Sequence, residues 1–303
     1  MEHVSRYQDF AEIFTQKIQK LSSHRYEYKQ QNQFYEDLKK TLPKNWCIAA
    51  GDFSENFSFF ESHEIQSAYY GRKQCTIFPF IVNYNQNDEI KHFSATFISD
   101  SLKHGCTEVY SFISILNEHV KDIFPERTYQ VFMSDGAAQH FKQKGNFANL
   151  ACHHLDYGLE AEWNFQASSH GKGGLYPITE KIKTSIFIII IITGWDGVGS
   201  IVKAHARKEI IKNPYNCPIR GPFSFFEETQ RFFKNMKVFY VSKEDIERIY
   251  NENNLQERYD AAKTIQGTQR LHHFRTVPGS NTHLNVKPVS NLDDSFYEMK
   301  RIM

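Results

Sequence analysis

The spacing of apolar residues predicts a long helix at the start of the chain. Over residues 7–41, apolar side chains recur near helical spacing at Phe10, Phe14, Ile18 and Leu21. Pro43 cannot continue a helix and therefore ends it. We expect residues 1–44 to form a helical segment that either packs on a sheet or belongs to an upstream domain.

From residue 45 the pattern becomes that of strands alternating with helices. A turn rich in Asn, Gln and Asp at 83–88 separates two strands that are rich in aromatic and β-branched residues. The expected strands are 46–53, 66–83, 92–99, 129–133 and 162–167, and the expected helices are 107–123, 137–150 and 197–210.

This order predicts an α/β fold with a mixed five-stranded sheet flanked by helices. Three strands, a helix, a strand, a helix, a strand and a helix form the succession that an RNase H-like sheet needs, although several α+β folds share it. We expect this core to span residues 45–212. Residues 213–303 would form a helical and extended C-terminal appendage.

The composition favours a folded, intracellular protein over a disordered, disulfide-rich or membrane protein. Hydrophobic residues make up 40% of the 303 residues and aromatic residues 15%, which is enough for a folded core. The five cysteines are an odd number, widely scattered and without a C-x-x-C pair, which indicates reduced thiols in an intracellular protein, nuclear or cytoplasmic. No apolar stretch approaches the roughly 20 residues of a membrane helix, so we expect no membrane partner.

Charge is unevenly distributed along the chain. Residues 197–303 carry 17 Lys and Arg against 12 Asp and Glu, whereas the whole chain has a net charge of +1. Residues 261–290 contain Arg270, Arg275 and two lysines but no acidic residue. Such a stretch suits contact with a polyanion such as DNA, although an ordinary solvated face would have the same composition.

Two aspartates stand at the ends of apolar stretches that predict strands. Asp52 lies near the end of the predicted strand 46–53, and Asp135 stands two residues after the predicted strand 129–133. If these two strands are neighbours, both carboxylates emerge at the same edge, where they can bind two Mg²⁺ or Mn²⁺ ions. The alternative is that each Asp only caps a turn, which is a common role for Asp next to Gly.

The sequence around these aspartates resembles a family of animal transposon-derived proteins with a DDE/D transposase-type, RNase H-like domain. The matching words are Asp52-Phe-Ser-Glu-Asn56, Ser134-Asp-Gly-Ala-Ala-Gln-His-Phe-Lys142, Trp163-Asn-Phe-Gln-Ala-Ser-Ser-His-Gly-Lys-Gly173 and Asp196-Gly-Val-Gly199. The resemblance covers about 45–275, and the four words in this order are more specific than any one alone.

The resemblance implies roles for individual residues. Asp52, Asp135 and Asp196 match the three metal-binding, catalytic acids, and Asp196 is expected to open the helix 197–210, where the helix dipole favours a carboxylate. The candidate DNA contacts are His170, Lys172, Lys142, Lys203, Arg270 and Arg275. The implied activity is metal-dependent hydrolysis or strand transfer on DNA. A non-catalytic remnant that acts as an interaction module is the alternative, and self-association into a homo-oligomer is left open.

Residues 174–194 interrupt this pattern. In the family the SHGKG word stands two residues before the third Asp-Gly, whereas here residues 174–195 intervene, with a run of isoleucines at Ile188–Ile192. One interpretation is an unspliced intron or other insertion, in which case the segment should protrude from the core and the third acid could be misplaced. The other interpretation is a genuine but unusual strand.

Overall fold

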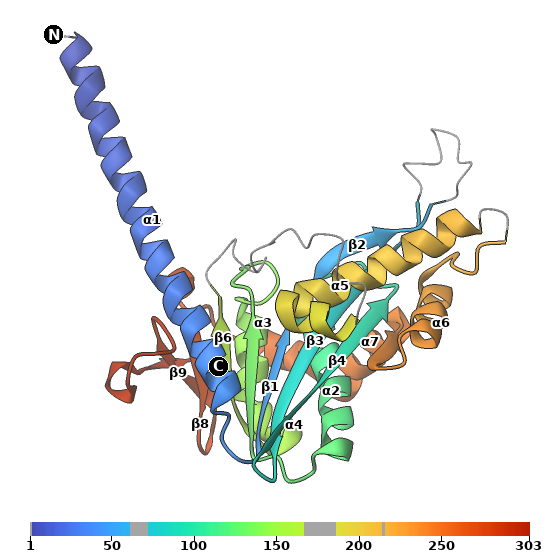
Figure 1. Ribbon diagram of the computed structural model, residues 1–303. Helices are drawn as coiled ribbons and strands as arrows, with labels where there is room; N and C mark the ends of the chain where they lie inside the picture. Colours follow the sequence, from blue (N-terminus) through green and yellow to red (C-terminus); the bar gives the residue numbers. More distant parts are fainter. Residues whose placement is uncertain (1, 61–71, 167–185, 214–215) are drawn as a thin grey trace.

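The computed structural model describes residues 2–60, 72–166, 186–213 and 216–303, with the backbone alone for 2–6, 8 and 186–195. The chain forms a mixed α/β structure in which helices cover both faces of one sheet (Figure 1). The helices are α1 (Glu2–Lys40), α2 (Cys106–Ile123), α3 (Lys144–Ala151), α4 (His153–Tyr157), α5 (Ile186–Lys212), α6 (Pro222–Phe232), α7 (Lys243–Glu252) and α8 (Leu255–Ala261), with 3₁₀ turns η2 (Thr268–Arg270) and η3 (Asp294–Phe296).

Ten strands of the described chain belong to this sheet. Its order is β10-β9-β8-β6-β5-β1-β3-β4-β7, and β2 pairs with β3 beside this path. The strands are β1 (Trp46–Gly51), β2 (Ser54–Ser58), β3 (Gln74–Gln86), β4 (Glu89–Ser99), β5 (Tyr129–Ser134), β6 (Glu160–Phe165), β7 (Met236–Val241), β8 (His273–Val277), β9 (Ser280–Lys287) and β10 (Glu298–Arg301).

The centre of the sheet combines antiparallel and parallel pairing. β1 and β3, and β3 and β4, pair antiparallel, whereas β1 and β5, and β5 and β6, pair parallel. The β3–β4 hairpin closes through Asn87 and Asp88, which both have positive φ, as a two-residue turn requires. The turn therefore lies inside the predicted 83–88 segment.

Alternate residues of the central strands pack against different helices. Cys47 and Ala49 of β1 belong to the core beneath α2 and α3, whereas Ile48 and Ala50 pack with Tyr35 near the end of α1. On the same side as α1, Val198 and neighbouring residues of α5 pack on β3 and β4. β1 is thus covered on both faces, as a central strand with parallel pairing usually is.

The sheet is larger than the expected five strands. The region 213–303, predicted as an appendage, contributes β7 at one edge and β8, β9 and β10 at the other. The β8–β9 hairpin turns at Gly279, which has φ 75°. These strands are short and half-polar, so their periodicity was too weak to predict them, and they are formed by pairing with edges that the core already provides.

Two helices begin at other positions than expected. The predicted helix 137–150 begins only at Lys144, because the carbonyl of Ala137 accepts hydrogen bonds from His140 and Phe141 in a tight turn. Residues 188–192 lie inside α5, so the prediction of an unusual strand there is wrong. The remaining part of the suspected insertion, 174–185, lies outside the described residues. None of the described helices is long and apolar enough to cross a membrane.

Candidate functional site

Asp52 and Asp135 stand at the same edge of the sheet, as predicted. β1 and β5 are adjacent and parallel, with Ala50 opposite Met133, so each aspartate follows the end of its strand at the same level. The backbone N–H of Phe53 donates to Asp52 Oδ1 at 2.7 Å, and the N–H of Ala137 donates to Asp135 Oδ1 at 3.0 Å. The backbone thereby fixes one oxygen of each carboxylate.

Asp196 reaches this edge from α5. The helix starts at Ile186, so Asp196 lies in its interior, and the expectation that it opens the helix is wrong. Its position depends on close packing, because a Cβ on Gly199 would lie 3.1 Å from the Cβ of Ser54 and would collide with its hydroxyl. Gly199, the last residue of the word Asp196-Gly-Val-Gly199, thus lets α5 lie directly against β2.

Charge repulsion marks the three aspartates as one cluster. The pKa of Asp52 is raised to about 8, mainly by burial and also by the negative charges of Asp135 and Asp196, while the hydrogen bond from Phe53 N–H opposes the shift. Burial also raises the pKa of Asp135, opposed by Ala137 N–H, His140 and Lys142. Carboxylates that disfavour one another's ionisation are stabilised by a shared cation.

The donor chemistry fits Mg²⁺ or Mn²⁺, which prefer carboxylate oxygens. Among the described residues, however, no three His, Cys, Asp or Glu side chains have their donor atoms arranged around one point. A shared ion would therefore require the carboxylates of Asp52, Asp135 and Asp196 to turn toward one another. The three aspartates therefore fit Mg²⁺ or Mn²⁺ in the type of their donor atoms, in their charge and in their location on the fold.

An aromatic and histidine wall beside Asp52 was not predicted. Phe53 stacks on His104, with ring centroids 4.1 Å apart, and meets the edge of His140 at 5.4 Å. His104 Nε2 lies 3.0 Å from Asn56 Oδ1. Burial lowers the pKa of His104 to about 4, with a further contribution from His140. His104 lies alone in a loop, and only its proximity in the fold reveals the association.

Lys142 does not stand on a solvated helix. It lies in the turn before α3 and is only 7% exposed, with Nζ 5.2 Å from the centre of the Phe165 ring. Burial lowers its pKa to about 8, while the charges of Glu27 and Asp135 oppose this shift. Lys142 is therefore placed to balance the charge of Asp135 rather than to meet DNA from the surface.

The remaining candidate DNA contacts do not form one group. Lys203 lies on α5 with Nζ 3.4 Å from the carbonyl oxygen of Glu55, near the aspartates. Arg270 is exposed at the end of η2. Arg275 lies over the ring of Tyr129, the first residue of β5, and is thus at the opposite end of that strand from Asp135. His170 and Lys172 lie outside the described residues.

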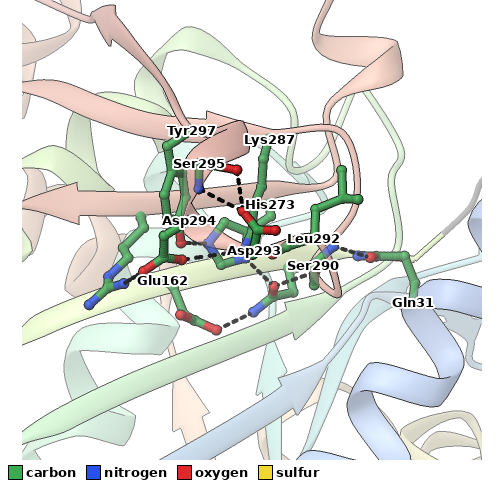
Figure 2. Close-up of polar contacts among 12 residues, drawn as sticks. Gln31, Glu162, His273, Lys287, Ser290, Leu292, Asp293, Asp294, Ser295 and Tyr297 are labelled. Carbon is green, nitrogen blue, oxygen red and sulfur yellow. Dashed lines mark hydrogen bonds and ion pairs between the residues drawn. The ribbon is translucent and has the colours of Figure 1, made fainter.

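A polar network that includes Glu162, His273 and Asp294 ties the C-terminal segment to the sheet (Figure 2). Arg275 belongs to it through an ion pair with Asp294 at 3.8 Å. Glu162 accepts hydrogen bonds from Tyr129 at 3.1 Å and from the amide of Asn164 at 2.9 Å. Because that amide nitrogen donates to Glu162, Asn164 Oδ1 is the acceptor for His273 Nδ1 at 2.7 Å. These buried groups satisfy one another, which indicates a structural role.

Comparison with known proteins gives a family without an assigned function. The model of a domain of unknown function, DUF8701, matches residues 31–189 and 193–290. The break at 190–192 falls within the isoleucine run of the suspected insertion. No curated protein and no solved structure matches the chain. Since the family model covers most of the sequence, the chain belongs to the DUF8701 family.

Proposed function

We propose that this chain is a transposon-derived DDE/D-type transposase core that hydrolyses or transfers phosphodiester bonds of DNA, inside the cell, with two Mg²⁺ or Mn²⁺ ions. The observation that carries the proposal is the gathering of Asp52, Asp135 and Asp196 at one edge of the sheet, where burial and the charges of the other two aspartates together raise the pKa of Asp52 to about 8. A cluster of carboxylates that resists ionisation in the absence of a cation is typical of a metal centre.

The sheet supports an RNase H-like assignment of the core. Three antiparallel strands, β1, β3 and β4, precede two parallel strands, β5 and β6, and helices separate the later ones. The first and second acids follow the neighbouring strands β1 and β5. Fold likeness alone does not establish an activity, so the proposal depends on the acids.

Each residue of the site has a distinct task in the proposed reaction. Asp52 and Asp135 would hold the ions with carboxylates that backbone N–H groups already orient, and Asp196 would complete the set from α5. Divalent ions at this place would supply activation of a water or 3′-hydroxyl and stabilisation of the leaving oxygen. Lys142 balances charge next to Asp135, and Lys203, which lies beside the Glu55 carbonyl oxygen, would contact the DNA backbone.

Nicking of supercoiled DNA tests the proposal. The chain should bind Mn²⁺ in calorimetry and nick plasmid DNA only when Mn²⁺ or Mg²⁺ is present. Asp52→Asn, Asp135→Asn and Asp196→Asn should each abolish nicking but retain DNA binding. That binding should weaken steeply as the salt concentration rises. Asp88→Asn is the matched control, because Asp88 lies in the β3–β4 turn with positive φ, a conformation that Asn adopts well.

The same assay separates the enzyme from the alternative. DNA binding without metal-dependent nicking in any variant would replace the proposal with a non-catalytic interaction module. Nicking that survives all three aspartate substitutions would show that the activity lies elsewhere or in a contaminant.

A further inference from the structure

The N-terminal half of α1 carries an apolar stripe that the other described residues of the chain leave exposed. Figure 1 shows α1 projecting away from the sheet, with the N-terminus at its far end. Only its C-terminal part packs on the core, through Phe34, Tyr35 and Leu38. Between Tyr7 and Leu21, six large apolar side chains are between 45% and 74% exposed. Ile13 lies to one side, and the other five form the stripe: Tyr7, Phe10, Phe14, Ile18 and Leu21.

These five side chains share one face of the helix. Their successive spacings of three, four, four and three residues keep them within about 80° of arc at 3.6 residues per turn. The rings of Phe10 and Phe14 stack at 5.9 Å, as neighbours on one face do. The stripe lies roughly a quarter turn or more away from the face that packs on the sheet, so it does not simply continue the core contact.

The stripe is symmetric about Phe14. Reversing the helix direction exchanges Tyr7 with Leu21 and Phe10 with Ile18, and leaves Phe14 opposite Phe14. A second copy of the same helix, laid antiparallel about a two-fold axis at Phe14, would therefore bury every residue of the stripe against another. A two-fold contact of this kind is self-complementary and closed.

We propose that this face of α1 is a homodimerisation surface, in which two copies of the chain pair their projecting helices antiparallel around Phe14.

Area and length agree with this pairing. The exposed parts of the five side chains amount to about 700 Å² per chain, close to the roughly 800 Å² that each partner buries in a standard interface. From Phe14 to the region where α1 meets the core at Glu27 and Gln31, the helix rises about 20–25 Å. The two sheets would therefore lie at opposite ends of the helix pair without collision.

Sedimentation equilibrium of the full chain tests the surface. The wild type should be a dimer at micromolar concentration, and Phe14→Glu should be a monomer with an unchanged far-UV circular dichroism spectrum, because Phe14 belongs to none of the described core clusters. Gln16→Glu adds the same charge on the opposite face of the helix and should remain a dimer. A monomeric wild type at about 100 µM, or a Phe14→Glu variant that stays dimeric, would overturn the proposal.

Cysteine cross-linking tests the direction of the pairing. A mixture of Tyr7→Cys and Leu21→Cys chains should form a disulfide-linked dimer on mild oxidation, whereas either variant alone should not. A parallel pairing would instead cross-link each variant with itself. A chance contact would give the same yield of disulfide-linked dimer in the mixture as in each variant alone. Either of these results would refute the antiparallel dimer.

Discussion

Acid should destabilise this chain through histidines that are buried in the neutral form, and His153 is the clearest case. Its Nδ1 lies 2.8 Å from the carbonyl oxygen of Leu159, which can only accept, so Nδ1 carries the proton and Nε2 the lone pair. Nε2 is buried and has no hydrogen-bond partner among the described residues. The ring lies 5.5 Å from that of Phe132, so a proton added at Nε2 would bury a charge beside an aromatic ring.

The size of the effect follows from linkage. Burial lowers the pKa of His153 from 6.5 to about 4. The unfolded chain takes up this proton as the pH falls below about 6.5, whereas the folded chain resists it until about pH 4. Stability is therefore complete above this window and falls through it, by about 2 kcal/mol at pH 5 and about 3 kcal/mol below pH 4 for this residue.

Urea unfolding at pH 7.5 and pH 5.0 measures this loss. His153→Asn keeps an N–H that can donate to Leu159 but cannot take a proton, so its free energy of unfolding should fall by about 2 kcal/mol less than that of the wild type between the two pH values. His154→Asn, at the exposed neighbouring position, should follow the wild type. An equal loss in His153→Asn and the wild type would refute the assignment of this acid sensitivity to His153.

Three further changes test the fold and the site. Gly199→Ala should push α5 away from Ser54, lower the free energy of unfolding by about 1–3 kcal/mol and weaken Mn²⁺ binding, whereas Gly221→Ala, where a Cβ meets no atom within 4 Å, should do neither. Arg258→Met should cost about 3 kcal/mol in urea unfolding, because it leaves buried Asp156 without the two 2.7 Å hydrogen bonds from Arg258. Arg248→Met, at an exposed ion pair, should change little. A chain lacking 174–194 should nick DNA faster than the full chain if this segment is an insertion, and an equal or slower rate would count against that hypothesis.

The sequence predicted the central strands and the first two acids well. β1 and β5 are strongly apolar and bounded by turn residues, so their ends, and hence the positions of Asp52 and Asp135, could be predicted from local pattern. Their adjacency was an assumption that the parallel register of Ala50 and Met133 confirms.

Other features depend on contacts that sequence pattern does not encode. β7 and β10 are short edge strands whose formation depends on the strand that they join, so local propensity gave no signal for them. Lys142 was predicted as a candidate DNA contact, but it follows the turn at Ala137 and its Nζ lies 5.2 Å from the centre of the Phe165 ring. His104 joins the site only because Phe53 stacks on it, across a long separation in sequence.

The most direct test of the account is to locate bound manganese in crystals grown or soaked with Mn²⁺, by anomalous scattering. The account predicts manganese bound by the carboxylates of Asp52 and Asp135, with Asp196 in the same cluster, and no peak there in Asp52→Asn crystals. Saturating Mn²⁺ with no peak at this edge of the sheet, or peaks only at unrelated surface carboxylates, would contradict a metal centre and with it the proposed nuclease.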